Sequence, residues 1–158
     1  MDQGVISEKS VKELGELKIV GFRVICEDEK YIEEIPKAAK ELEERKEEIE
    51  HILNPNQQIG AFVVEETISE KDGYWIGVQV SEYGNIPESM TTLTIPPQKY
   101  AAVLHTEPIH LIRNSYAQLH KWIEEKGHTR SYTAWNLEIY HLKNGPENLQ
   151  VELFDSIL

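Results

Sequence analysis

The order of expected secondary structure occurs twice along the chain, and this repeat constrains the fold most. A β-rich stretch, an amphipathic helix and two further β-rich stretches return at an offset of roughly 75 residues. One βαββ unit covers only one face of its small sheet, so two units pair to protect sheet edges and the second face. The sequence therefore predicts an α+β fold of duplicated βαββ units, with two small antiparallel sheets, a helix on each, and a ligand cleft between the halves.

Hydrophobic spacing predicts the elements of the first half. Apolar, β-rich runs predict three strands: LKIVGFRVIC (17–26), IGAFVVEET (59–67) and GYWIGVQVSE (73–82). Apolar residues at helical spacing predict a helix over residues 33–53, and Asn54-Pro55-Asn56 ends it. The turn-forming segment ISEKDG makes the last two strands a hairpin. Residues 1–17 carry no firm pattern and are interpreted as an N-terminal extension to a single domain over 18–158.

The second half, approximately 90–158, repeats the order of the first, approximately 18–82. A long β run, MTTLTIPPQKYAAVLHTE, is interrupted by Pro96-Pro97, which predicts a bend or an edge because a central strand excludes such a pair. Helical spacing from Pro108 to Lys126 predicts the second helix, with Gly127 as its stop. A second hairpin is expected from AWNLEIYHL and NLQVELFDSI, joined by KNGPE.

Net charge excludes several classes of partner. The chain has 28 acidic and 16 basic side chains, a formal net charge of -12. Such an excess repels nucleic-acid phosphates and anionic membrane surfaces. The first residues are too polar and acidic for a signal peptide, no apolar run approaches the roughly 20 residues that span a bilayer, and the one cysteine, Cys26, suits a reducing compartment. We therefore expect a cytoplasmic protein that binds neither nucleic acid nor membrane.

No motif for a metal ion or cofactor is present in the sequence. The histidines show no HxxxH, HExxH or Cys/His spacing, and are interpreted as scattered residues without a metal role; they are His51, His105, His110, His120, His128 and His141. GxSxG, GxGxxG and GKS/T segments are absent as well. The sequence therefore predicts no metal site, no cofactor and no triad hydrolase.

One carboxylate interrupts an otherwise apolar strand near the C-terminus. Alternation places Leu137 and Ile139 on one face of this strand and Asn136, Glu138 and Tyr140 on the other. Glu138 is then either a solvent-exposed side chain on a half-wet sheet or a carboxylate on the floor of an aromatic pocket. In such a pocket, a desolvated negative charge would attract a lipophilic cation.

Aromatic residues elsewhere bear on that choice. On the strand from Tyr74 to Val80, Trp75 lies opposite the apolar face together with Gly77, whose missing side chain leaves room above the sheet. Trp75 therefore either lines a cleft or packs across the interface between the repeats. Tyr116 is on the inner stripe of the second helix, where spacing alone favours a core role.

The segment from Tyr74 to Gly127, followed by WNLEIY, resembles a known family, and the likeness is most specific in GVQVSE, MTTLTIPPQKYAAVLHT and LEIY. Together with LQVELF these resemble the GyrI-like small-molecule-binding domain, which is the effector-binding half of multidrug-sensing AraC-type and MerR-type regulators. The likeness covers roughly residues 18–155. Where the family often has H-x-G-P, this chain has Glu107 in place of the glycine.

The resemblance implies a cleft lined by aromatic side chains, with one acidic residue on the penultimate strand. The acidic position falls on Glu138, and the ligand-binding wall falls on Trp75, Tyr116 and Tyr140. We expect a stand-alone binding protein for bulky, hydrophobic, cationic small molecules. One alternative is a hydrolase of strained electrophiles with Glu138 as general base and Tyr140 as donor. Another is a modulator of DNA gyrase, or of a separate regulator, through protein–protein contact.

Overall fold

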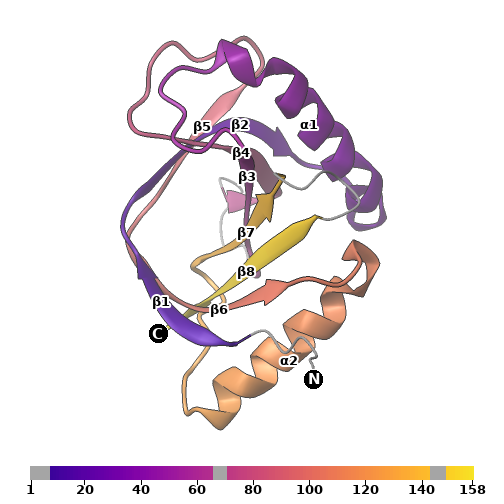
Figure 1. Cartoon of the computed structure of the whole chain (residues 1–158), viewed down its shortest axis with the longest axis vertical. Helices are drawn as coiled ribbons and strands as arrows, with labels where there is room; N and C mark the ends of the chain where they lie inside the picture. Colours follow the sequence, from indigo (N-terminus) through magenta and orange to yellow (C-terminus); the bar gives the residue numbers. More distant parts are fainter. Residues whose placement is uncertain (1–7, 66–70, 143–148) are drawn as a thin grey trace.

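Two βαββ units make up the structure, a computed structural model that describes residues 8–65, 71–142 and 149–158 (Figure 1). The first unit contains β2 (Leu17–Val24), α1 (Tyr31–Arg45), β3 (Gln57–Val63) and β4 (Tyr74–Val80). The second contains β6 (Gln98–His105), α2 (Ile112–Glu125), β7 (Trp135–His141) and β8 (Gln150–Ile157). A short strand precedes each unit, β1 (Ser10–Leu14) and β5 (Thr91–Ile95). The repeat and the α+β class are confirmed; the turn KNGPE and residues 68–70 of ISEKDG lie outside the described residues.

All eight strands belong to one antiparallel sheet, in the order β1-β6-β8-β7-β3-β4-β2-β5. The two halves join where β3 pairs with β7 along its whole length, from Gln57 opposite His141 to Val63 opposite Trp135. The sequence predicted two small sheets, and this central pairing merges them into one. Pairing satisfies the backbone groups that each half would otherwise leave open at its edge.

The short strands cross over to the opposite unit and curve the sheet. β1 pairs with β6, and β5 pairs with β2. The register runs on from one pair to the next, with Leu14 opposite Gln98 and Leu17 opposite Ile95, so β1–β2 and β5–β6 form one long bent ribbon. Pro96-Pro97 lies at the bend, as expected, where the ladder is interrupted. This ribbon connects the two ends of the sheet, which wraps around an interior (Figure 1).

Three hydrophobic clusters follow from this arrangement. The cluster inside the curved sheet draws on both units and includes Trp75, Trp135 and Tyr100. On the outer face, α1 covers its own half of the sheet and α2 covers the other (Figure 1). Tyr140 belongs to the cluster under each helix. The helix-facing side of the β3–β7 pair is therefore the place where the two halves meet.

The first helix ends earlier than its hydrophobic spacing predicts. α1 ends at Arg45 and a short 3-10 turn follows, whereas the pattern extended the helix to Leu53. His51 then adopts a left-handed backbone with φ 65°, and Ile52 bridges to Val80 of β4. Ile49 and Ile52 still pack under α1, although they lie outside the helix. Their burial gives the sequence the apolar spacing of a longer helix. The stop of α2 at Gly127, with φ 76°, is confirmed.

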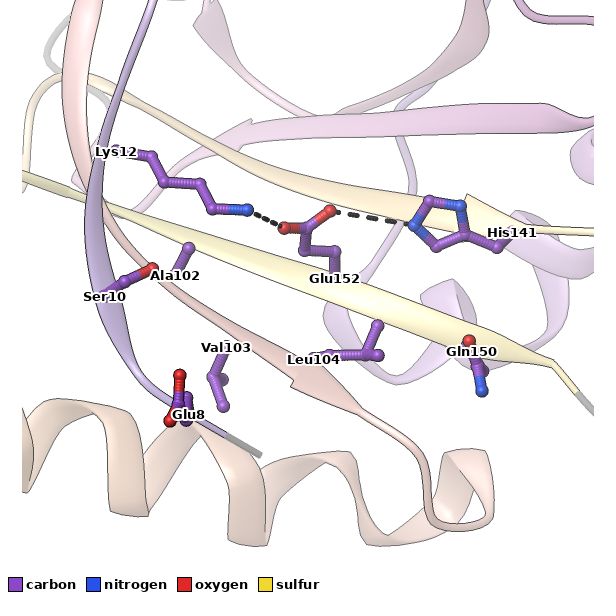
Figure 2. Close-up of a pocket in the computed structure, with 9 residues that line it drawn as sticks. All are labelled: Glu8, Ser10, Lys12, Ala102, Val103, Leu104, His141, Gln150 and Glu152. Carbon is purple, nitrogen blue, oxygen red and sulfur yellow. Dashed lines mark hydrogen bonds and ion pairs between the residues drawn. The ribbon is translucent and has the colours of Figure 1, made fainter. Parts of the chain in front are cut away.

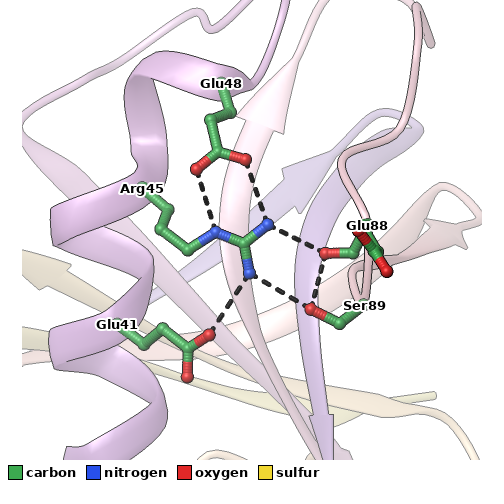
Figure 3. Close-up of polar contacts among 5 residues, drawn as sticks. All are labelled: Glu41, Arg45, Glu48, Glu88 and Ser89. Carbon is green, nitrogen blue, oxygen red and sulfur yellow. Dashed lines mark hydrogen bonds and ion pairs between the residues drawn. The ribbon is translucent and has the colours of Figure 1, made fainter.

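The segment that connects the two units is anchored to the end of α1 by Arg45 (Figure 3). The guanidinium donates to the carbonyl of Glu88 at 2.8 Å and to Ser89 Oγ at 3.1 Å. It also pairs with both oxygens of Glu48 at 3.0 Å and with Glu41 at 3.2 Å. These carboxylates raise the pKa of Arg45, chiefly through the hydrogen bonds from Arg45 to Glu48. Ser89 has a left-handed backbone with φ 67°, so Arg45 holds a strained point of the connector.

Candidate functional site

Glu138 lies at the centre of the molecule's internal symmetry. It is the middle residue of β7, and it pairs with Gly60, the middle residue of β3. Because β3 and β7 hold equivalent places in the two units, the pseudo-twofold axis of the repeat passes between these residues. Glu138 faces the helices and is 9% exposed. The chain therefore carries one carboxylate at the axis, with a glycine where its repeat equivalent would stand.

Three tyrosine hydroxyls donate hydrogen bonds to this carboxylate. Tyr74 donates to Oε1 at 2.5 Å and Tyr140 to the same oxygen at 2.8 Å, while Tyr116 donates to Oε2 at 2.6 Å. The hydroxyls of Tyr74 and Tyr140 are also 2.8 Å apart. The donors come from β4, β7 and α2, so both units contribute to the site. The group of Glu138, Tyr74, Tyr116 and Tyr140 is called the tyrosine cluster below.

Gly60 makes room for one of these tyrosines. A side chain built at Gly60 would collide with the hydroxyl of Tyr74 and would meet Tyr74 Cε1 at 2.9 Å. The Tyr74 ring therefore lies across the glycine to reach Glu138 on the neighbouring strand. A glycine inside a strand commonly marks such a close approach.

Burial sets the protonation state of the phenols. Removal from water, followed by the negative charge of Glu138, raises the pKa of Tyr74, Tyr116 and Tyr140 well above the ordinary value. Both causes disfavour a tyrosinate anion. The three hydroxyls consequently remain donors, and the carboxylate of Glu138 is their common acceptor.

A second buried carboxylate on the same face shows what is distinctive about Glu138. Asp155 on β8 is 0% exposed, and it pairs with Arg130 Nε at 2.9 Å and with His120 Nε2 at 2.8 Å. In the described ranges, by contrast, Glu138 is held by phenols alone, and its hydrogen-bond partners include no basic side chain. A buried charge without a counter-charge costs several kcal/mol. The tyrosine cluster offers hydrogen bonds to Glu138 but no positive charge.

Comparison with known proteins identifies the family. A profile described as Cass2, integron-associated effector binding protein, matches residues 10–155. The chain belongs to the Cass2 family. The resemblance to effector-binding domains that the sequence indicated is thereby confirmed. A search of curated proteins gives no significant match to this Cass2-family chain.

Solved structures support the fold of this Cass2-family protein. The EcmrR C-terminal domain is 20% identical, with a TM-score of 0.68 and coverage of 98% of this chain and 99% of that one. SAV2435 bound to tetraphenylphosphonium is 16% identical, with a TM-score of 0.72 and coverage of 96% and 94%. A hydrolase encoded by lin2189 from Listeria innocua is 12% identical, with a TM-score of 0.52 and coverage of 96% and 91%. This chain spans 57% of the EcmrR chain in the EcmrR–DNA complex.

The structure brings three of the four predicted wall and floor residues together and separates the fourth. Glu138, Tyr140 and Tyr116 are in direct contact, whereas Trp75 lies on the opposite face of the sheet. The Trp75 ring packs edge-on against Trp135 of the other unit, with centroids 5.1 Å apart. It is therefore excluded from the tyrosine cluster. The alternative interpretation from the sequence, packing across the repeat interface, describes Trp75 correctly.

Sequence reasoning missed Tyr74 and Gly60. Alternation places Tyr74 on an apolar strand face and gives it no role, because it defines the faces of one strand and not which strands are neighbours. Gly60 was a usable signal, since a glycine within a β-rich run suggests close approach of another group. Gly60 is paired with Ile76 on β4 and with Glu138 on β7, so Gly60, Ile76 and Glu138 lie on one face of the sheet.

The histidines are dispersed in the fold. His105 is buried and bonds through its ring nitrogens to Ser115 Oγ at 2.6 Å and to the carbonyl of Pro108 at 3.0 Å, which fixes the chain before α2. Across the described residues no group of three or more His, Cys, Asp or Glu side chains could hold a metal ion. No helix in those same ranges is long and apolar enough to cross a membrane.

Proposed function

We propose that this Cass2-family protein binds bulky, hydrophobic, cationic small molecules in the cytoplasm, and that Glu138 supplies the counter-charge. The observation that carries the proposal is the difference between the partners of the two buried carboxylates. Asp155 has arginine and histidine partners, whereas Glu138 has only tyrosine hydroxyls among the described residues. A ligand cation at Glu138 would provide the missing positive charge, and the rings of Tyr116 and Tyr140 would offer it π faces.

The family description and one similar structure support the ligand class. Cass2 proteins are described as effector-binding. SAV2435 carries tetraphenylphosphonium, which is a lipophilic cation with a delocalised charge. Such an ion is weakly hydrated, so it loses little on entering a buried site. A carboxylate in a low-dielectric setting then favours it over a neutral compound of the same size.

The test compares a cation with a neutral compound of similar shape. Isothermal titration calorimetry with tetraphenylphosphonium should show saturable binding to the wild-type protein, and Glu138→Gln should weaken it by about tenfold or more. Triphenylphosphine oxide, which is neutral, should bind weakly and about equally to both proteins.

Glu124→Gln is the matched control, because Glu124 is an exposed carboxylate on α2. It removes the same charge from the molecule and should leave the affinity for tetraphenylphosphonium unchanged. Equal affinity of wild type and Glu138→Gln for the cation would refute the role of Glu138.

A second candidate function is hydrolysis of a strained electrophile. The contact of Tyr140 with Glu138 Oε1 favours it, since a carboxylate base and a phenol donor stand side by side on one strand. The lin2189 protein is described as a hydrolase. Incubation with a panel of epoxides and other strained electrophiles tests this function. Turnover that disappears in Glu138→Gln would support it, and saturable binding without turnover would favour simple ligand binding.

A further inference from the structure

A pocket of about 460 Å³ is lined by residues of β1, β6, β7 and β8, the four strands at one end of the sheet (Figure 2). Its polar lining includes Lys12, Glu152 and His141, and its apolar lining includes Ala102 and Leu104. His141 follows Tyr140 on β7, but alternation points the two side chains to opposite faces of the sheet. The pocket is therefore separate from the site of Glu138.

The polar lining forms a row in which Glu152 lies between Lys12 and His141. Lys12 on β1 extends over β6 to reach Glu152 on β8, with Nζ 2.7 Å from Oε2. On the other side of Glu152, His141 Nε2 is 3.7 Å from Oε1, and Gln57 contacts His141 Nδ1 at 3.4 Å. Figure 2 shows Lys12 and His141 pointing at Glu152 from opposite sides. Glu8 adds a second carboxylate to the lining.

We propose that this pocket binds a small zwitterion with an apolar side chain, of the α-amino-acid type. A simple anion bound to Lys12 would leave Glu152 without its lysine partner, and a simple cation bound to Glu152 would leave Lys12 without its carboxylate partner. A molecule with both charges can place its carboxylate against Lys12 and its ammonium against Glu152, so Lys12 and Glu152 both stay paired. Its side chain would lie on Ala102 and Leu104, and the volume falls in the range of small-molecule pockets, roughly 300–1,000 Å³.

The resident ion pair is weak enough to be replaced. The side chain of Lys12 is 46% exposed and that of Glu152 is 21% exposed. Pairs so open to water contribute little to folding, because solvent screens them and the long side chains lose entropy. A ligand that divides Lys12 from Glu152 therefore loses little stabilisation and provides each with a new partner.

Three probes of one shape test the proposal on the full chain by backbone amide NMR. L-Leucine carries both charges, leucinamide only the ammonium, and 4-methylpentanoate only the carboxylate. Leucine should shift the amides of Ala102, Leu104 and His141 in a saturable way, and the two singly charged probes should bind at least about tenfold more weakly.

Two variants should shift the preference of the pocket from leucine toward a singly charged probe. Glu152→Gln should weaken leucine binding about tenfold and strengthen 4-methylpentanoate, because it removes the repulsion of a carboxylate and frees Lys12. Lys12→Gln should weaken leucine and strengthen leucinamide for the converse reason. Glu13→Gln is the matched control, since Glu13 is an exposed carboxylate on β1 that does not line the pocket.

Other outcomes would overturn the proposal. These are absence of shifts, equal shifts with all three probes, or shifts centred on Tyr116 and Tyr140. Glu138→Gln should leave leucine binding intact, so a failure of this pocket and a failure of the tyrosine cluster give different results.

Discussion

At the scale of single residues, Glu138 and Asp155 show that burial alone does not define a functional carboxylate. Both lie on the helix-facing side of the sheet and both are buried. Asp155 pairs with the Arg130 guanidinium and contacts His120, which ties the end of β8 to the loop before β7 and to α2. Glu138 accepts hydrogen bonds without neutralisation by any described residue. The difference in partners, and not in exposure, is what supports the proposed ligand role of Glu138.

Gly60 can be tested by adding one methyl group. Gly60→Ala should lower the free energy of unfolding by about 1–3 kcal/mol, because the new Cβ must displace the Tyr74 ring from its place over β3. The same displacement should remove the hydrogen bond from Tyr74 to Glu138 and change the affinity for tetraphenylphosphonium. Urea unfolding and calorimetry measure the two effects.

Gly15→Ala is the control, because a side chain at Gly15 would meet nothing within 4 Å. Its stability should stay within about 0.5 kcal/mol of wild type. An unchanged stability of Gly60→Ala would mean that Tyr74 does not depend on the space above Gly60.

At the scale of elements, Arg45 links α1 to the segment between the two units. Arg45→Gln should lower the urea midpoint and speed hydrogen exchange at the amide of Met90, which bonds to the carbonyl of Pro87 next to the anchor. The reason is that the shorter, neutral glutamine side chain cannot span both the connector and the carboxylates of α1.

Lys37→Gln serves for comparison, since Lys37 is exposed and pairs with the half-buried Glu34 one turn away. Its midpoint should change less than that of Arg45→Gln. Similar exchange at Met90 in both variants would contradict the anchoring role.

The hydrogen bond that Arg45 donates lowers the pKa of Glu48, and partial removal from water opposes this shift. Glu48 therefore stabilises the fold above its unfolded-state pKa, and this contribution is lost as pH falls through the native value. The anchor is accordingly weaker in acid.

At the scale of the whole molecule, the tyrosine cluster joins the two units at the pseudo-twofold axis. The native pKa of Tyr74, Tyr116 and Tyr140 is raised above the ordinary value of about 10 that the unfolded chain has. Above that pH the unfolded chain loses protons that the native protein retains. Stability should therefore fall as pH rises, by about 1.4 kcal/mol per pH unit for each such tyrosine.

Urea unfolding between about pH 8 and about pH 11 measures this slope. Tyr116→Phe removes one of the three groups and should make the fall shallower by about one tyrosine's share. A slope equal to that of wild type would show that Tyr116 ionises in the native protein as it does in the unfolded chain.

The sequence by itself determined the elements and their faces. Apolar spacing located most strands and both helices, although it extended the first helix too far. Pro96-Pro97 indicated the bend, Gly127 indicated the helix stop, and alternation placed Glu138 and Tyr140 on one face. These features depend on residues close along the chain, whose side chains repeat with the pitch of a strand or helix. The exposed strand β1 was missed because, with no buried face, it shows no apolar alternation.

Only the tertiary structure decided which faces meet. The pairing of β3 with β7 merged the two expected sheets, brought Tyr74 to Glu138 and left Trp75 in the interior. The crossing of β1 to β6 set Lys12 beside Glu152. Such pairings join residues far apart in sequence, and they are selected by edge satisfaction and burial over the whole sheet, which no local pattern encodes.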